Sequence, residues 1–569
     1  MASLQKKIKN GRPYWYVIEV ARVDGQPRVV RQRYLGTVEA IEAAFDSAFE
    51  PMSIEVVEFG ASAAAWGMAS RIGVGLAVDA SVTKRSQGLT VGTYLQAAAV
   101  NRVVAPRSKR GFITWYDQSV VSRLLPASPE AWSSQRFWDA MHKVREADLQ
   151  GIEEAIVSST VEGFGIEMEA LVFDATNFHT FIATTNPKVP IAQRGHAKNK
   201  RHDLRLVGLA LACSRDHQIP LASKLVAGNT PDVRSFEATL PLLVRRLEAV
   251  GVDASSVTVV FDKGNDSKAN FEALSDTGMG FVGSLVPTQH PDLLAVADEA
   301  YEAVEDLAGV TAWRGTKEIF GVARTVVVTR SQSFLEDQLV GLAQTRRRVE
   351  TQLGELVRLL EGHRHKMDQA KLTDRVAEAL SPRWMRRLYR CEITGEGKED
   401  LALAWSFDEA AFETLAATEL GKRIIFTDRG SWSTRDIIVA YRSQWEVEAA
   451  FRQMHDPHHA AFRPIYHWTD HKIRVHGLYS VAALIIVNLL WREADRAGLG
   501  LSPRETLEAL ASIREVTLVY PPARARGQPR VRHKLTRMDQ TQQRLFELFE
   551  LDAFAPRVGN TAKWRGFGS

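Results

Sequence analysis

The sequence predicts a multidomain α/β protein, and three observations lead to that prediction. The chain has 569 residues, whereas a single hydrophobic core stops growing at about 250–300 residues. Its composition, 45% hydrophobic and 25% charged, is typical of folded domains and argues against a mainly disordered or fibrous protein. Short apolar runs typical of buried strands occupy the centre of the chain, and helical periodicity lies on either side of them.

Cysteine usage and the N-terminus point to a cytoplasmic protein. The two cysteines, Cys213 and Cys391, cannot form a disulfide framework, which favours a reducing compartment. The first residues are basic but no apolar stretch follows them, so we expect no signal peptide. The most apolar segment, 477–491, is shorter than the ~20 residues of a membrane span. We therefore expect it to be a buried helix.

Basic residues are concentrated in two segments, although the net charge is only +4. Residues 1–34 contain eight Lys and Arg residues against Glu19 and Asp24, and residues 521–537 contain six and no acid. Such segments suit a polyanionic partner, and binding of that kind weakens as salt rises. A solvated surface explains each segment equally well.

The first 165 residues predict a β-hairpin followed by a helical region. Residues 14–35 alternate apolar and polar side chains on either side of Asp24 and Gly25, a strong hairpin signal. From 58 to 165 the periodicity is helical, with one helix ending before Pro106 and another beginning after Pro129.

The centre predicts the opening of an RNase H-like fold. Three short apolar runs are followed by a helical segment and a fourth run that ends in an acid, at residues 169–178, 203–214, 219–228, 233–250 and 257–262. Continuous apolar runs bounded by turn residues fit a sheet that is covered on both faces. The order is therefore β-β-β-α-β.

The next part of the chain predicts an insertion that contains a helix pair. Residues 309–331 and 384–406 resemble strands. Between them, 333–380 has apolar residues at three- and four-residue spacing among many charges, which predicts a projecting antiparallel helix pair. A strand-like run at 421–428 and a helix follow, and the basic C-terminal region ends in an amphipathic helix at 541–551.

Two aspartates are candidates for metal-dependent chemistry. Asp174 and Asp262 each stand where we expect an apolar strand to end. A carboxylate there is costly unless it is solvated, paired or bound to a metal. On neighbouring strands the two could share Mg²⁺, which prefers carboxylate oxygens, and ions about 3.5–4 Å apart support phosphoryl transfer. The alternative is that each Asp caps a turn.

A third acid is expected on a helix over 438–455. Five residues there recur at intervals of four and three and so share one face: Tyr441, Trp445, Glu448, Arg452 and His455. Glu446 is two residues from Glu448 and so points to a different side of the expected helix, where we expect it to pair with Arg442. Trp445 is expected to be a buried packing residue.

Other polar clusters have two readings. Six histidines between 455 and 476 suggest zinc, but their spacing matches no familiar closed site, so we expect none. A basic cluster beside the first Asp could line a DNA path or form a solvated loop; it comprises Arg194, Lys198, Lys200, Arg201 and Arg205.

Seven motifs in order resemble the insertion-sequence DDE transposases. They are DATNF, RGHAKNKRHDLRLVGLAL, VAGNTPD, FDKGND, IIFTD, YRSQWEVEAAFRQM and RPIYHWTDHKIRVH, and the resemblance covers roughly 165–495. It implies an RNase H-like catalytic core interrupted by a β-rich and helical insertion. It also implies a Mg²⁺ site, with Mn²⁺ as a substitute, formed by Asp174, Asp262 and Glu448.

One departure affects the last motif. Related hairpin-forming enzymes carry Tyr-x2-Arg-x3-Glu-x6-Lys, whereas the register here gives Tyr441, Gln444, Glu448 and His455. Arg442 or Arg452 could supply the phosphate contact instead, and a DNA-hairpin step stays open. The YR-W-E-FR form resembles one branch of these enzymes.

The resemblance implies metal-dependent cut-and-paste transposition in a bacterial cytoplasm, at the nucleoid. The expected partners are terminal inverted repeats, target DNA and at least one further copy of the chain. The expected DNA-binding residues are Tyr441, Arg442, Arg452, Arg194, Lys198, Lys200 and Arg201. Two alternatives are a domesticated, non-catalytic DNA-binding protein and an RNase H-fold nuclease without strand transfer.

The predicted organisation has six parts. They are an N-terminal β-hairpin, a helical region that binds DNA ends, the first part of the core, the insertion, the second part of the core with the Glu448 helix, and a basic helical C-terminal region. Their expected ranges are 1–55, 56–165, 166–300, 301–420, 421–495 and 496–569.

Overall fold

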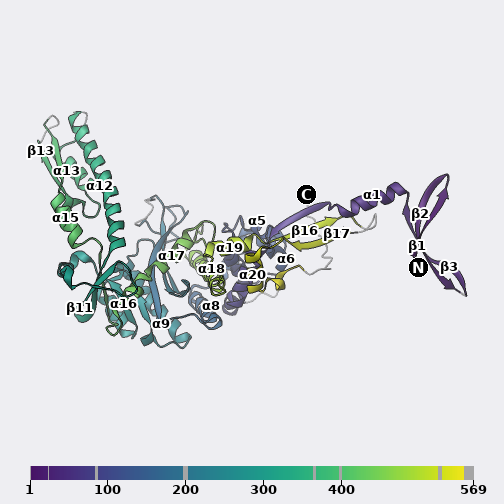
Figure 1. Cartoon of the computed structure of the whole chain (residues 1–569), viewed down its shortest axis with the longest axis horizontal. Helices are drawn as coiled ribbons and strands as arrows, with labels where there is room; N and C mark the ends of the chain where they lie inside the picture. Colours follow the sequence, from purple (N-terminus) through teal and green to yellow (C-terminus); the bar gives the residue numbers. More distant parts are fainter. Residues whose placement is uncertain are drawn as a thin grey trace. The chain divides into compact units, whose positions relative to one another are not determined.

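The computed structural model describes residues 2–23, 25–83, 88–195, 201, 203–362, 367–395, 400–522 and 528–556. The chain divides into two compact units, one made of Met1–Ile156 with Gln453–Ser569 and the other of Val157–Arg452. Figure 1 labels the elements of both. The chain is therefore a mixed α/β protein of more than one domain.

The second unit contains a large mixed sheet with the strand order β10-β11-β12-β15-β9-β8-β5-β6-β7. One end of the sheet is an antiparallel meander of β5 (Ala170–His179), β6 (Leu206–Ser214) and β7 (Pro220–Ala227). Helix α9 (Asp232–Ala249) packs on these strands and leads to β8 (Thr258–Val260), which lies parallel to β5. The predicted β-β-β-α-β order is confirmed, and the arrangement is consistent with an RNase H-like core.

Burial explains why these segments form strands of the large sheet. All nine residues of β6 are buried, as expected for a strand covered on both faces. Phe236 of α9 meets Phe173 of β5 and Phe261 beyond β8, with ring centroids 4.9 and 5.2 Å apart. These aromatic contacts fix the helix against the strands that carry Asp174 and Asp262.

The sheet extends beyond the predicted unit. Helix α10 (Lys268–Asp276) leads to β9 (Gly280–Ser284), which is parallel to β8, and α11 (Pro291–Leu294) follows. The remaining strands are β10 (Glu302–Ala303), β11 (Val310–Ile319), β12 (Val322–Ser331) and β15 (Lys422–Thr427). Strand β15 pairs antiparallel with both β12 and β9. The first part of the predicted insertion therefore consists of strands of the large sheet.

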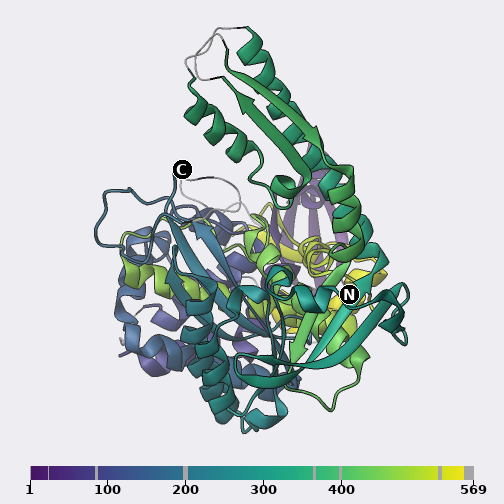
Figure 2. The same cartoon turned by 90° about the vertical axis from the view of Figure 1, so that its left-hand side faces the viewer.

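The later part of the predicted insertion forms a separate arm. It comprises α12 (Gln332–Glu361), α13 (Gln369–Ala379), α14 (Met385–Leu388), β13 (Tyr389–Thr394), β14 (Ala402–Phe407) and α15 (Glu409–Thr418). Figure 2 shows these elements side by side, in green. They enclose their own apolar cluster, which includes Leu353, Leu372 and Leu415. The predicted helices within 333–380 are confirmed.

The arm joins the sheet at one place. Strand β12 runs directly into α12, and β15 begins directly after the arm. The Ser331 N–H donates to the Gly421 carbonyl across 2.9 Å, and Arg330 pairs with Lys422 in the sheet. The two chain connections of the arm are therefore hydrogen-bonded to each other at its base.

The first unit begins with a three-stranded antiparallel sheet of β1 (Ala2–Lys9), β2 (Arg12–Val23) and β3 (Gln26–Gly36). The predicted hairpin is confirmed as β2 and β3, with Gly25 at a φ of +75°, while Asp24 lies outside the described residues. Strand β1 was not predicted. All eight of its residues are exposed, and Lys6 interrupts the alternation of Ala2, Leu4 and Ile8 that could have revealed the strand.

Helix α1 (Val38–Phe49), which packs on β2 and β3, was not predicted. A helical body follows, as predicted for 58–165. Its helices are α2 (Gly60–Arg71), α3 (Val74–Ser81), α4 (Val91–Val104), α5 (Phe112–Asp117), α6 (Val121–Leu124), α7 (Ser134–Lys143) and α8 (Leu149–Phe164). Helix α4 ends before Pro106, as predicted. Helix α7 has Ser133 as its N-cap and begins later than predicted, because residues 129–132 form a 3₁₀ turn.

The core of the first unit is α18 (Asp470–Arg496), which packs against α2, α4, α7 and α19 (Pro503–Ala511). By length and composition α18 could span a membrane, but 89% of its most apolar window is buried in the fold. The prediction of a buried helix at 477–491 is confirmed. The C-terminal region, predicted to be basic and helical, also contains strands: β16 (Arg514–Tyr520) and β17 (Arg530–Leu535) form a sheet with β4 (Ser53–Glu58) before α20 (Gln540–Leu548).

Two histidines of the crowded segment belong to this core. His467 and His476 are buried, with Nε2 of His467 3.0 Å from Nδ1 of His476. The Nε2 of His476 is 2.6 Å from the Phe462 carbonyl oxygen. Burial lowers the pKa of both rings well below the usual range, so both are neutral.

Candidate active site

Asp174 and Asp262 occupy matching positions on neighbouring parallel strands. Val172 of β5 pairs with Val260 of β8, and each aspartate lies two residues beyond its valine. Because side chains alternate along a strand, both carboxylates belong to the same face of the sheet as that pair. The prediction that Asp174 ends a strand is wrong, since β5 continues to His179 through pairing with β6. Asp262 does follow the end of β8.

Two hydroxyl groups hold the carboxylate of Asp262. Ser284 Oγ, at the end of β9, donates to Oδ1 across 2.8 Å. The phenol of Tyr441 donates to the same oxygen across 3.3 Å. Burial, followed by the charge of Asp262, raises the pKa of Tyr441 to about 12, so the phenol keeps its proton.

The helix predicted over 438–455 is two helices. Helix α16 (Thr434–Arg442) ends at Ser443, and α17 (Gln444–His455) begins directly after it. Ser443 is buried, and a turn bond from the Glu446 N–H to its carbonyl spans 2.9 Å. Tyr441 and Glu448 are therefore on different helices, with Tyr441 buried and Glu448 exposed.

A cavity of about 340 Å³ brings Asp262 and Glu448 together. Tyr441, Ser284 and Trp445 also line it. Five basic side chains contribute to the same lining, namely Lys263, Arg383, Lys422, Arg423 and Arg442. Five cations against two carboxylates leave a positive excess of three, which suits a phosphodiester.

The chemistry of Asp174, Asp262 and Glu448 fits a divalent cation, because carboxylate oxygens are the ligands that Mg²⁺ prefers. The strand register supports pairing of Asp174 with Asp262, and the cavity supports pairing of Asp262 with Glu448. Within the described residues, no group of three or more His, Cys, Asp or Glu side chains is arranged to hold a metal. The three acids are thus linked in pairs rather than gathered at one point.

Two expectations about the motif helices are wrong. Glu446 does not pair with Arg442; it accepts a hydrogen bond from Gln218 Nε2 across 2.9 Å, and burial raises its pKa. Trp445 is not a buried packing residue, because 52% of its side chain is exposed. The break at Ser443 changes which residues face inward.

The predicted DNA-binding residues fall into separate places. Arg442 lines the cavity, Arg452 is exposed on α17, and Tyr441 is buried against Asp262. Arg194 and Arg201 are exposed in the loop before β6, while Lys198 and Lys200 lie outside the described residues. Arg201 pairs with Asp203 across 2.7 Å.

Arg205, which was considered with that basic cluster, is structural. Its guanidinium donates to the carbonyls of Asn186 and Val189 across 2.9 and 2.6 Å, and also to the Ala192 carbonyl. These bonds tie the loop that follows β5. The guanidinium of Arg205 is therefore used to hold backbone carbonyls of this loop.

The structure adds residues that sequence reasoning missed. Arg423 and Lys422 begin β15, directly before the IIFTD motif, and Arg383 comes from the arm. Asp266 is the second acid of FDKGND, and its Oδ1 is buried without a hydrogen-bond partner among the described residues. Burial, followed by the charge of Asp262, raises the pKa of Asp266 to about 8. The available signal was that Asp266 lies within the FDKGND motif and that Lys422 and Arg423 directly precede IIFTD, whereas Arg383 lies in no quoted motif.

No curated protein matches this chain. Among solved structures, it is similar to the piggyBac transposase in a synaptic complex with hairpin DNA, at 7% identity and a TM-score of 0.37 over 79% of each chain. Residues 166–380, which include Asp174 and Asp262 and end before Glu448, match the transposase DDE domain.

Proposed function

We propose that this protein is an insertion-sequence transposase that cuts the ends of its element and joins them to target DNA. The observation that carries the proposal is the shared cavity of Asp262 and Glu448, combined with the register of Asp174 and Asp262 in a region that matches the transposase DDE domain. The excess of basic side chains in the cavity supports a phosphodiester substrate.

Asp174, Asp262 and Glu448 would hold the divalent cation. When bound, Mg²⁺ would stabilise the charge that develops on the phosphate oxygens. Glu448 is exposed and lines the same cavity as Asp262, so its carboxylate would be accessible to the cation and to DNA.

The surrounding side chains position the acids and the DNA strand. Tyr441 and Ser284 orient Asp262. Arg383 and Arg442 would neutralise the phosphodiester, while the Lys422 ammonium donates to the Leu294 carbonyl across 3.0 Å and anchors the start of β15. Catalysis in such a site rests on positioning and charge neutralisation.

We assign recognition of the terminal inverted repeats to the basic N-terminal sheet and the helical body of the first unit. Eight Lys and Arg residues lie within residues 1–34, and strands β1 to β3 are largely exposed. Joining two element ends requires at least two copies of the chain. We place the reaction at the nucleoid of a bacterial cell.

The test is Mg²⁺-dependent cleavage of DNA that carries the element's own ends. We expect the wild type and Glu446→Gln to cut at the end, and Glu448→Gln to bind without cutting. Glu446 is the matched control because it lies on the same helix but bonds to Gln218. Cutting by Glu448→Gln at the wild-type rate would reject the site.

A second assay separates the alternatives. Strand transfer from a pre-cleaved end distinguishes a transposase from a nuclease of similar fold. Binding of the ends by the wild type without any cleavage would favour a domesticated DNA-binding protein.

A further inference from the structure

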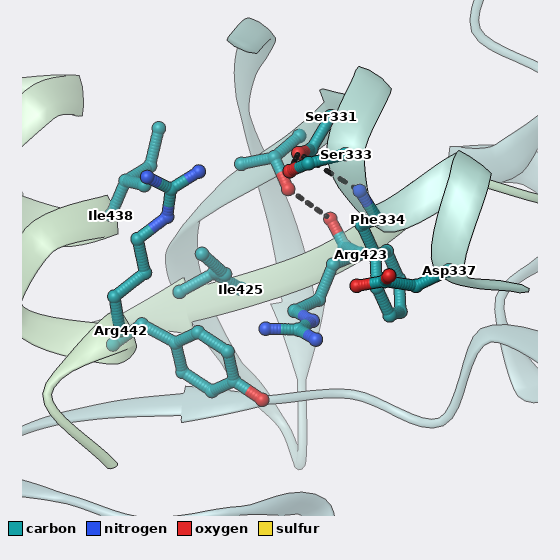
Figure 3. Close-up of a pocket in the computed structure, with 10 residues that line it drawn as sticks. Ser331, Ser333, Phe334, Asp337, Arg423, Ile425, Ile438 and Arg442 are labelled. Carbon is teal, nitrogen blue, oxygen red and sulfur yellow. Dashed lines mark hydrogen bonds between the residues drawn. The ribbon is translucent and has the colours of Figure 1, made fainter. Parts of the chain in front are cut away.

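A second cavity of about 280 Å³ adjoins the candidate active site (Figure 3). Arg423, Arg442, Phe334 and Tyr441 line both cavities, so the two share a wall. The hydroxyl of Tyr441 bonds to Asp262 on the active-site side. Whatever occupies the second cavity therefore lies next to the group held in the first.

Hydroxyl groups and guanidinium groups dominate the polar lining of the second cavity. Ser331 and Ser333 come from the start of α12, with their Oγ atoms 3.1 Å apart, and Thr329 comes from β12. Ser331 also caps α12, accepting from the Phe334 N–H across 3.5 Å. Hydroxyls and arginines are the side chains that bind phosphate oxygens.

Arg423 is half-buried and lacks an anionic partner among the described residues. Its guanidinium carbon lies 4.5 Å from the centre of the Phe334 ring and 5.3 Å from that of Tyr441. Neither Arg423 nor Arg442 forms an ion pair within the described part of the chain. Aromatic rings offset only part of the cost of desolvating a guanidinium, so an anionic ligand would stabilise it further.

Asp337 also lines the cavity, which raises the alternative of a cationic ligand. Its side chain is exposed, and one carboxylate faces two guanidinium groups. The charge of the lining is therefore +1 in total. An anion is favoured over a cation.

We infer that the second cavity binds a DNA phosphate that neighbours the phosphate cut in the first cavity. This inference rests on the proposed function. Arg423, from β15, supplies positive charge from the wall between the two cavities.

The test measures binding of end DNA by Glu448→Gln in Ca²⁺, with a single methylphosphonate placed at each phosphate near the cut. We expect the neutral linkage to weaken binding about tenfold at one neighbouring position. In the double variant Glu448→Gln with Arg423→Gln, the methylphosphonate at that position should weaken binding no further. In the control, Glu448→Gln with Arg348→Gln on the exposed side of α12, the same methylphosphonate should still weaken binding about tenfold.

Two further readouts keep the result interpretable. Arg423→Lys should restore part of the loss, and the thermal unfolding of each variant shows whether β15 still folds. The inference would be overturned if the protein still bound end DNA but each methylphosphonate weakened binding equally, with and without Arg423→Gln. Failure of the wild type to bind or cut the ends would instead count against the proposed function.

Discussion

Tyr441 donates a hydrogen bond to Oδ1 of Asp262 across 3.3 Å, although 179 residues separate the two. The bond connects the end of α16 to the loop that follows β8. Because Ser284 donates to the same oxygen, the carboxylate is held from two directions. Any movement of α16 therefore reaches Asp262 directly.

Tyr441→Phe should slow end cleavage about tenfold and lower the free energy of unfolding by about 0.5–1.5 kcal/mol. The ring still fills its site, but Asp262 loses one of its two donors. Single-turnover cleavage and chemical denaturation measure the two effects. Tyr301→Phe is the control, since its buried hydroxyl has no partner among the described residues; a similar slowing there would contradict the explanation.

Asp174→Asn and Asp262→Asn should each reduce cleavage by at least about a thousandfold and leave end binding within a few fold. Each change removes a negative charge that the cation requires and preserves the shape of the side chain. Gel-based cleavage and anisotropy measure the two properties. Asp276→Asn, at the exposed end of α10, should have no effect. Residual cleavage by Asp174→Asn near the wild-type rate would remove Asp174 from the site.

Titration of Asp266 should make the free energy of unfolding fall as pH rises in metal-free buffer. Burial raises its folded-state pKa to about 8, against an ordinary value of 3.8. The folded state therefore holds the proton more tightly, and this stabilisation is fully present below pH 3.8 and is lost as pH rises through about 8. Asp266→Asn mimics the protonated form and should flatten the decline of the unfolding free energy between about pH 5 and pH 8. Identical pH profiles for the variant and the wild type would contradict the role of burial.

Gly228→Ala should lower the free energy of unfolding by about 1–3 kcal/mol. A Cβ at Gly228, in the VAGNTPD motif, would lie 2.0 Å from the Leu206 carbonyl oxygen, which is backbone and cannot rotate away. Thermal or chemical unfolding measures the loss. Gly163→Ala is the matched control, because nothing lies within 4 Å of its added Cβ and alanine favours the helix. An equal effect at both positions would remove the close approach as the cause.

The β-β-β-α-β order of the core could be predicted because its strands are continuous apolar runs, and α18 could be predicted because its apolar run is unusually long. The residues at which helices and strands end could not be predicted. Strand β5 continues past Asp174 because pairing with β6, rather than local composition, decides where it stops. The break at Ser443 was hidden because the four- and three-residue spacing of Tyr441, Trp445 and Glu448 continues across it.

The candidate site was predictable only in part for a related reason. Motif order pointed to Asp174, Asp262 and Glu448, whereas Arg423 enters the cavity through the pairing of β15 with β12 and β9. Contacts between strands that are distant in sequence leave no local pattern. Ser284, at the end of β9, was missed for the same reason, whereas Arg383 enters the cavity from the arm.

The closed base of the arm has a consequence for how this protein can change. Because Ser331 and Gly421 are hydrogen-bonded neighbours, β12 and β15 would keep their pairing if the arm between them changed in length. Residues of the arm that line the two cavities, among them Ser333, Phe334 and Arg383, would have to stay. Evolution is free to remodel the rest of the arm, while the strands of the sheet keep their register.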